Sequence, residues 1–473
     1  MKIIIAGAGK VGSSVAGILA GEGHDITVID KRADIISNIS NNLDVICVQG
    51  SATSSATLIE AGAKDADLVL ATTRNDEINM VCGISARKLG TKHVIARIRD
   101  TAYLHETEFL REALGLSAVV NPEYECAREI SRILRFPSAN RVDTFAKGSA
   151  ELIDHRVLPG SKLCGKQLKE LPQIFGAKVL VGVVQRGSEV IIPNGDFSIQ
   201  ENDRLSVTGA SKELRRFFTA TGEYRKPVKR VMIMGGSRIA VYLAKLLIET
   251  GISVTIVELN RELCRELSEE MPQARIINAD ASSGDVLLEE GLESMDAFVA
   301  LTGDDGSNII TSIYAKSCKV GKIIVKVNRE YYSEILSSAG IESVVTPRVL
   351  VSQQLARYVR AMSNSVGSSM ETLYRFADGK VEALEFVVSE SSACTGKALK
   401  ELKLKSNIIV AAFFCRSQLD WGEKVSAHYD LVQDSVLIFW GVVLVQLRKR
   451  FQQNGVFDGS GGVDHDGPPR VLV

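Results

Sequence analysis

An internal repeat relates the two halves of this sequence. Residues 2–30 read KIIIAGAGKVGSSVAGILAGEGHDITVID, and residues 229–258 read KRVMIMGGSRIAVYLAKLLIETGISVTIVE. Gly7 and Asp30 recur as Gly235 and Glu258, at a constant offset of 228 residues. Two further segments align farther along the chain: ATLIEAGAKDADLVLATTRNDEIN with DVLLEEGLESMDAFVALTGDDGSN, and HVIARIRD with IIVKVNRE. Because a whole unit is duplicated, both halves are expected to adopt the same fold.

Within the first repeat, short apolar runs alternate with amphipathic segments. The pattern predicts strands at 3–5, 26–29, 45–48, 68–71 and 93–97, and helices at 11–21, 33–41 and 54–61. Alternating strands and helices form parallel sheets, whose buried strands read as continuous Ile/Val runs. The fold class is therefore α/β, with two doubly wound parallel-sheet (Rossmann-like) domains.

Two smaller segments repeat as well. GKQLKEL at 165–171 matches GKALKEL at 396–402, and β-type runs broken by PNGD and END follow the first copy, which predicts small hairpin-rich α+β domains. The expected division is 1–135 (nucleotide-binding), 140–224 (small), 228–360 (nucleotide-binding) and 368–450 (small, with a divergent end). The Gly/Asp/Pro-rich residues 451–473 are expected to be a disordered tail.

A helix is predicted after the last strand of each large domain. Asn121 or Thr346 can cap it, and a proline follows at the first helical position, where its missing N–H costs nothing. Apolar residues recur at helical spacing from Cys126 to Leu134. The sequence leaves open whether this helix packs on its own sheet or on a partner.

Composition excludes several classes of function. The 56 basic and 57 acidic residues leave a net charge of -1, which gives no electrostatic basis for binding nucleic acid or an anionic membrane. The eight cysteines form no C-x-x-C pair, so neither a metal site nor a disulfide framework is expected. The longest apolar run, residues 436–447, is shorter than the roughly 20 residues of a spanning helix, so we expect a soluble protein.

The first repeat opens with a glycine-rich turn between a buried strand and a helix. Gly7, Gly9 and Gly12 form the G-x-G-x-x-G pattern in the context that a dinucleotide site requires. The first glycine permits the tight turn, the second lets a pyrophosphate approach the backbone, and the third lets helix and strand pack closely. The helix N-terminus then offers N–H groups to the phosphates.

Asp30 ends the second predicted strand, 18 residues after Gly12. A carboxylate at this place can accept hydrogen bonds from both ribose hydroxyls and repels a 2'-phosphate, which favours NAD(H) over NADP(H). The adjacent cations Lys31 and Arg32 keep NADP(H) open as an alternative.

Further polar residues follow the next strands. Thr72 and Thr73 come just after the carboxyl end of the fourth strand, where such sheets hold ligands. Asn75 and Asp76 fit either a helix cap or the ligand site. Arg97 ends an otherwise buried strand, and nucleotide phosphates could supply the anion that it needs.

The second repeat keeps only part of this pattern. It has Gly235, but Ser237 and Ala240 stand where Gly9 and Gly12 stood. Ser237 adds bulk where a pyrophosphate would meet bare backbone. Acid and cation persist, because Glu258 and Lys326 occupy the positions of Asp30 and Arg97. We therefore expect a second nucleotide site that is weaker or altered in its ligand.

The paired GAGxVG...D...GSAT...T...N...R units, alternating with LxGKxLxEL...PNGD modules, resemble the RCK (or KTN) family, the regulators of potassium conductance. The resemblance spans residues 1 to about 440. It implies binding of NAD(H), or of another adenine nucleotide such as ATP or ADP. Its first site would comprise Gly7, Ala8, Gly9, Lys10, Val11, Gly12, Asp30, Ser51, Thr73, Arg74 and Arg97, and its second Gly235, Gly236, Ser237, Arg238, Ile239, Glu258, Asp280 and Lys326.

The resemblance also implies a role. Proteins of this family form rings beneath a membrane-embedded ion-translocating subunit, and nucleotide binding changes ion flux. It implies a cytoplasmic regulatory subunit, peripheral on the inner face of the plasma membrane, that forms a homo-oligomeric ring, with a tetramer expected, and gates potassium flux without catalysis. An NAD-dependent dehydrogenase is the main alternative, although none of the six histidines lies in an acid/base motif. A DNA-binding repressor lacks a basic helix-turn-helix segment.

Overall fold

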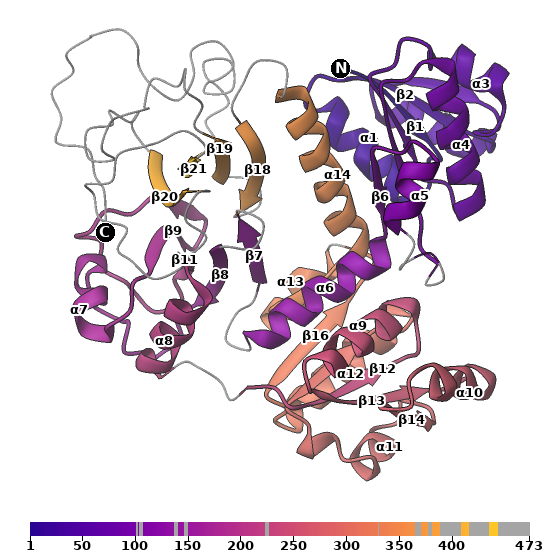
Figure 1. Ribbon diagram of the computed structural model, residues 1–473. Helices are drawn as coiled ribbons and strands as arrows, with labels where there is room; N and C mark the ends of the chain where they lie inside the picture. The colour runs from indigo at the N-terminus through magenta and orange to yellow at the C-terminus, as the bar shows by residue number, and fades with distance from the viewer. Residues whose placement is uncertain are drawn as a thin grey trace, which may run out of the picture. The chain divides into compact units, whose positions relative to one another are not determined.

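The computed structural model describes residues 1–100, 103, 107–136, 141–145, 150–222, 227–329, 331–364, 370–376, 381–387, 408–415 and 435–442. The chain divides into two compact units, one formed by residues 1–134 with 228–356 and the other by residues 135–227 with 357–473 (Figure 1). The first unit contains two six-stranded sheets, and the second contains a five-stranded and a four-stranded sheet. The expected tail at 451–473 lies outside the described residues.

The first sheet is parallel and has the strand order β3-β2-β1-β4-β5-β6. Its strands are β1 (Lys2–Ala6), β2 (Asp25–Asp30), β3 (Ile46–Gln49), β4 (Leu68–Ala71), β5 (His93–Arg97) and β6 (Ala118–Val120). Its helices are α1 (Lys10–Ala20), α2 (Ala33–Asn42), α3 (Ser55–Glu60), α4 (Asp76–Leu89) and α5 (Thr107–Ala113). The strand order reverses between β1 and β4, and ligands of doubly wound sheets bind at the carboxyl ends of the strands beside such a reversal.

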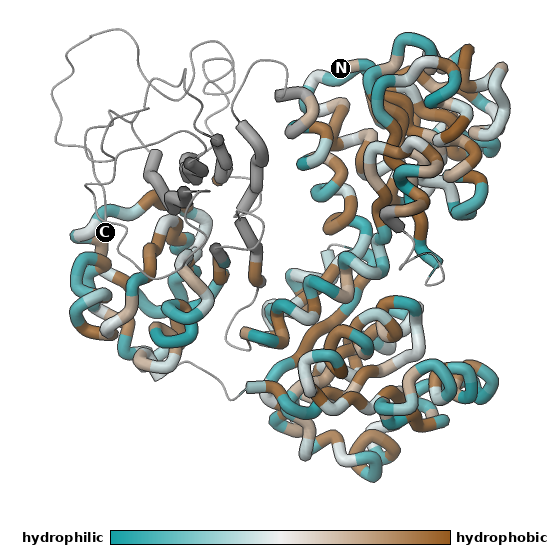
Figure 2. The backbone as a smooth tube through the Cα atoms, viewed as in Figure 1, coloured by the Kyte–Doolittle hydropathy of each residue, from teal (hydrophilic) through white to brown (hydrophobic). Residues whose placement is uncertain are grey.

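The second sheet repeats this topology as β14-β13-β12-β15-β16-β17, again parallel throughout. Its strands are β12 (Arg230–Met234), β13 (Ser253–Glu258), β14 (Arg275–Asn278), β15 (Ala297–Ala300), β16 (Lys322–Lys326) and β17 (Ser343–Val345). Its helices are α9 (Arg238–Glu249), α10 (Arg261–Glu270), α11 (Gly284–Glu289), α12 (Asp305–Ser317) and α13 (Tyr332–Ser338). Apolar strands run through the middle of each sheet (Figure 2), which confirms the doubly wound α/β prediction for both repeats.

The second unit is built from antiparallel sheets. The five-stranded sheet has the order β10-β9-β11-β8-β7, and the four-stranded sheet has the order β18-β19-β21-β20. The bounds are β7 (Arg141–Phe145), β8 (Ala150–Arg156), α7 (Leu171–Phe175), β9 (Leu180–Arg186), β10 (Glu189–Ile191), β11 (Arg204–Gly209), α8 (Ser211–Thr221), β18 (Met370–Phe376), β19 (Val381–Val387), β20 (Ile408–Cys415) and β21 (Ser435–Val442). Asn202 has a φ of 66° in the predicted END turn, and asparagine tolerates this left-handed conformation.

Helix α6 (Pro122–Arg135) leaves the first sheet and packs on the second. Ile130, Ile133 and Leu134 on its buried face share one hydrophobic core with Val231 and Ile233 of β12. Tyr124 of α6 also makes an edge-on ring contact with a tyrosine of α9, with 5.5 Å between ring centroids. The partner that the sequence left open is therefore the other half of the same chain.

Helix α14 (Pro347–Asn364) makes the reciprocal exchange. Val351 and Leu355 line a small apolar space together with Val11, Ile95 and Val120 of the first half. Figure 1 shows α14 beside α1 and β6, and α6 beside α9. Each sheet is thus covered in part by a helix that follows the other sheet in sequence, so the two repeats form one folded unit.

The exchange of helices makes a prediction about stability. Ile130 is fully buried against the second sheet, so Ile130→Ala should destabilise that sheet by about 2–5 kcal/mol through lost transfer energy and a cavity. Hydrogen exchange should report weaker protection of the amides in β12 and β13. Ile59→Ala, at an exposed position of α3, is the control and should change protection by less than about 0.5 kcal/mol. Loss of protection confined to the first sheet would contradict the exchange.

Candidate functional site

The first glycine turn is tightly packed on one side. Gly7 has a φ of 99°, and a Cβ there would lie 2.7 Å from the backbone nitrogen of Thr73. A Cβ on Gly12 would lie 1.9 Å from the carbonyl oxygen of Gly7. Thr72 closes the turn from the side of β4 by donating its hydroxyl to the same carbonyl, at 2.9 Å. These contacts leave no room for a side chain at either glycine.

Gly9 differs from its two neighbours in the pattern. A Cβ there would have no heavy atom of the described residues within 4 Å, so this side of the turn is open. Gly9 is also the N-cap of α1 and provides no side-chain cap to the first N–H groups of the helix. An open turn beside an uncapped helix N-terminus is where a pyrophosphate binds in doubly wound sheets.

Asp30 connects the turn to the end of β2. One carboxylate oxygen accepts from the Ala8 N–H at 2.8 Å, and the other accepts from the Arg32 N–H at 3.0 Å. The guanidinium of Arg32 lies 3.4 Å from Asp34 on α2. The carbonyl of Asp30 also accepts from the Gly50 N–H, which brings the end of β3 beside it. The carboxylate therefore stands between the glycine turn and the end of β3, the usual position of the ribose.

Asn79 organises the loop that follows β4. Its fully buried side chain accepts from the backbone N–H of Thr73 at 2.8 Å and from its hydroxyl at 2.7 Å. Its amide donates to the carbonyls of Thr73 and Arg97, at 3.2 and 2.8 Å. Sequence reasoning did not assign this role, although the signal was present, because Asn308 occupies the same place in the repeat.

Arg97 lies at the carboxyl end of β5. Its Nη2 donates to the carbonyl of Thr73, and its Nε has no hydrogen-bond partner among the described residues. Burial lowers the pKa of Arg97, and the positive charge of Arg99 lowers it further. Because its charged form is disfavoured, an anion beside this guanidinium would relieve the cost.

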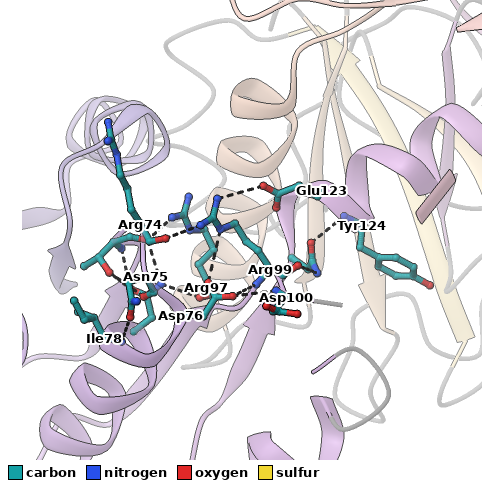
Figure 3. A network of polar contacts seen from close by, with 12 residues as sticks. Arg74, Asn75, Asp76, Ile78, Arg97, Arg99, Asp100, Glu123 and Tyr124 are labelled. Atoms are coloured by element: carbon teal, nitrogen blue, oxygen red, sulfur yellow. Dashed lines mark hydrogen bonds and ion pairs between the residues drawn. The ribbon is translucent and has the colours of Figure 1, made fainter. Parts of the chain in front are cut away.

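The acids near Arg97 are engaged by Arg99 (Figure 3). Asp76 accepts from the backbone N–H groups of Arg99 and Asp100, at 2.8 and 3.0 Å. The guanidinium of Arg99 lies 3.7 Å from Asp76 and 3.6 Å from Glu123, and it donates to the carbonyl of Arg74 at 2.6 Å. The sequence left open whether Asn75 and Asp76 cap a helix or belong to the ligand site. In the structure Asn75 caps α4, and Asp76 instead holds the loop after β5.

The candidate site at the carboxyl ends of β1, β2, β4 and β5 is the first crevice, and the corresponding site at the ends of β12, β13, β15 and β16 is the second crevice. The second crevice repeats the carboxylate arrangement of the first. Glu258 accepts from the Gly236 N–H at 2.6 Å and from the Asn260 N–H at 2.7 Å, as Asp30 does in the first. Asn308 likewise binds the backbone and hydroxyl of Thr302 and donates to the carbonyl of Lys326 at 3.0 Å. Lys326 is buried, which lowers its pKa, and its Nζ donates to the carbonyl of Thr302 at 2.6 Å.

The second glycine turn is less tightly packed at its first glycine than the first turn is, and it carries side chains at the other two positions of the pattern. A Cβ on Gly235 would meet Thr302 at 3.0 Å, a wider spacing than at Gly7, and the turn accommodates the methyl group of Ala240. Ser237 is the N-cap of α9 but makes no capping hydrogen bond, and its buried hydroxyl has no partner among the described residues. The second turn therefore differs from the first in both spacing and side-chain content, and an altered second site stays a prediction.

Ser51 and Asp280 take equivalent places after β3 and β14. Ser51 exchanges a hydrogen bond with the Thr53 hydroxyl at 2.9 Å. Asp280 accepts from the N–H and hydroxyl of Ser282, at 2.9 and 2.7 Å, and these hydrogen bonds lower the pKa of Asp280. In the part of the chain that the structure describes, no three His, Cys, Asp or Glu side chains are grouped so as to hold a metal ion.

The duplicated sheets with their glycine turns define a doubly wound α/β protein of the nucleotide-binding class. The TrkA-N domain model matches residues 3–122 and 231–347, and the TrkA-C domain model matches residues 152–222. The Trk system potassium uptake protein TrkA homolog of Archaeoglobus fulgidus is 32% identical over 87% of this chain and 91% of its own length. The TrkA of Halomonas elongata is 32% identical over 92% of this chain and 94% of its own. The chain belongs to the TrkA family.

Solved structures show the same fold. The GsuK channel bound to NAD has a TM-score of 0.61 at 18% identity, covering 95% of this chain and 78% of that one. The crystal structure of the GsuK RCK domain also has a TM-score of 0.61 at 18% identity, covering 95% and 94%. No helix in the described ranges is both long and apolar enough to cross a membrane.

The two glycines allow binding to be separated from folding. Gly9→Ala places a methyl group in open space, so the melting temperature should stay within about 2 °C, while affinity for NADH should fall at least about tenfold. Gly12→Ala must displace the Gly7 carbonyl and should lower the melting temperature as well. Calorimetric titration and thermal unfolding provide the two measurements. Unchanged NADH affinity in Gly9→Ala would remove the open face from the site.

Proposed function

We propose that this chain is the regulatory subunit of a Trk-type potassium uptake system. It binds an adenine nucleotide and thereby gates potassium flux through a membrane-embedded translocating subunit. The open turn at Gly9 is the observation that carries the proposal, together with Asp30, which binds the backbone of the turn at Ala8, and Arg97, which binds the loop after β4 at Thr73. The curated relatives support it, because they are named as Trk system potassium uptake proteins and this chain matches them over most of their length.

NAD(H) is the ligand that the first crevice favours. The residues proposed to contact it are Gly7, Ala8, Gly9, Lys10, Val11, Gly12, Asp30, Ser51, Thr73, Arg74 and Arg97. Asp30 disfavours a 2'-phosphate, and the ion pair of Arg32 with Asp34 directs that cation toward α2. ATP and ADP contain the same adenosine and phosphate groups that this crevice is proposed to bind. The second crevice takes such a nucleotide in altered geometry. The residues proposed to contact it there are Gly235, Gly236, Ser237, Arg238, Ile239, Glu258, Asp280 and Lys326.

Binding without turnover fits the placement of the histidines. His24 precedes β2 and His93 begins β5, so both lie at the amino edge of the sheet, opposite the crevice. His155 is buried against Phe218 in the five-stranded sheet. Thus no histidine in the described ranges stands at the carboxyl edge, where a dehydrogenase would need its acid or base. Sustained, substrate-dependent NADH oxidation by the purified protein would contradict a regulatory role.

The nucleotide sites are tested by removing their carboxylates. Asp30→Ala removes a charged hydrogen-bond acceptor worth about 1.5–3 kcal/mol, so NADH affinity at the first site should fall about 10- to 100-fold. Asp25→Ala, at the opposite end of the same strand, is the control and should bind normally. Calorimetry gives the affinities, and potassium uptake by cells expressing the chain with its membrane partner gives the response. A normal nucleotide response of uptake in Asp30→Ala would show that the first site is not the sensor.

The proposed ring places the chain beneath its membrane partner, on the inner face of the membrane, as a homo-oligomer for which a tetramer is expected. The repeat supports self-assembly, because α4 exposes Val81 and Ile84, and α12 exposes Ile310 and Ile313 at the corresponding positions. Each chain thus carries two like apolar faces, and contacts between like faces of successive copies can close into a ring. We propose a second copy of this chain as the occupant of each face.

Charged substitutions test these faces. Val81→Glu combined with Ile310→Glu should reduce the assembly to smaller species, because burying an unpaired carboxylate in an apolar contact is costly. The matched control is Ile59→Glu with Leu288→Glu, a corresponding exposed pair on α3 and α11. Light scattering after size-exclusion chromatography measures the mass. An intact ring in the first variant, or loss of the ring only in the control, would place the interface elsewhere.

A further inference from the structure

One hydroxyl connects the helix of the second glycine turn to the first crevice. Tyr242 lies on α9, five residues after the N-cap Ser237, and is 1% exposed. Its hydroxyl donates to the carbonyl of Arg99 at 2.9 Å and accepts from the amide of Asn121 at 2.9 Å. Burial raises the pKa of Tyr242, so the hydroxyl keeps its proton and remains a donor at neutral pH.

The other end of this link belongs to the first crevice (Figure 3). The carbonyl that accepts from Tyr242 is that of Arg99, two residues after Arg97, and the side chain of Arg99 bonds the carbonyl of Arg74. Arg74 and Arg97 are both candidate phosphate ligands. A displacement of α9 therefore reaches the backbone that positions these cations through two hydrogen bonds in series.

The same hydroxyl also contacts the start of the exchanged helix α6. Asn121 accepts from the Tyr124 N–H at 2.9 Å, which caps α6, and donates to the carbonyl of Arg99 at 3.3 Å. Glu123, on the first turn of α6, lies 3.6 Å from the guanidinium of Arg99. Tyr242 thus holds together the loop after β5 and the N-terminus of the helix that enters the second core.

The repeat does not provide the reverse link, from α1 of the first half to the loop after β16 of the second half. Ser14 of α1 stands at the position of Tyr242, and Thr346 stands at the position of Asn121. A serine side chain ends at its first atom beyond Cβ, so it cannot span the distance that a tyrosine ring covers. The two halves are therefore tied asymmetrically, which duplication alone does not require.

We propose that Tyr242 couples the two nucleotide sites, so that occupancy of the second crevice at α9 raises the affinity of the first. The inference rests on the proposed nucleotide-binding function. A ligand at the N-terminus of α9 fixes this helix, and the hydroxyl passes the restraint to the segment 97–99. Coupling free energies in proteins commonly correspond to about 5- to 150-fold changes in affinity, and the effect is reciprocal.

Calorimetry with ADP on the full-length chain measures the coupling. The product of the two association constants in the wild type, divided by the product of the single-site constants from Asp30→Ala and Glu258→Ala, gives the coupling factor. We expect a factor of about five or more in the wild type, and below about two when Tyr242→Phe is added to all three chains. Tyr124→Phe removes a hydroxyl from the adjoining ring and should leave the factor unchanged.

The outcomes separate the two proposals. A wild-type factor of one, ADP binding at a single site, or an undiminished factor in Tyr242→Phe would overturn the coupling while leaving nucleotide binding in place. The absence of any ADP binding would overturn the proposed function and the coupling with it. Thermal unfolding of Tyr242→Phe checks that the aromatic ring at position 242 still packs. A purely structural tyrosine would lower stability on substitution without changing the coupling factor.

Discussion

The burial of α6 in the core beside the second sheet is the interaction on which the first unit depends. Ile130, Ile133 and Leu134 are at most 2% exposed there, and each such side chain contributes about 1.5–3 kcal/mol by leaving water. Because α14 covers part of the first sheet in exchange, neither sheet completes its core alone. The two crevices consequently belong to one folded unit.

Each crevice is positioned by the same two devices. A carboxylate, Asp30 or Glu258, binds the backbone of the glycine turn and of the following loop. A buried asparagine, Asn79 or Asn308, joins the loop after one strand to the end of the next. Apart from the hydroxyls of Thr73 and Thr302, which both repeats keep, the partners are backbone groups. These networks therefore persist although the surrounding side chains differ, which explains why the second crevice keeps its form after losing two glycines.

The differences between the crevices concern charge and space. The first has an open turn at Gly9 and a guanidinium at Arg97 whose Nε has no hydrogen-bond partner in the part of the chain that the structure describes. The second has a hydroxyl at Ser237 and the shorter ammonium of Lys326. A guanidinium can bind phosphate oxygens in a bidentate manner, but an ammonium acts as a point charge. Two unequal crevices in one unit suit the proposed regulatory response to nucleotide.

The sequence was enough to predict the two doubly wound sheets, the strand ends that carry the polar residues, and the glycine turn. These follow from local periodicity and from turns that only glycine can make, such as the one at Gly7 with its φ of 99°. Three features depend on the folded chain and could not be predicted: which sheet α6 covers, that Asp76 holds the loop after β5, and that Tyr242 reaches Arg99. Those contacts join residues far apart in the chain, up to 143 positions for Tyr242 and Arg99, and an amphipathic pattern shows that a face is buried without showing against what.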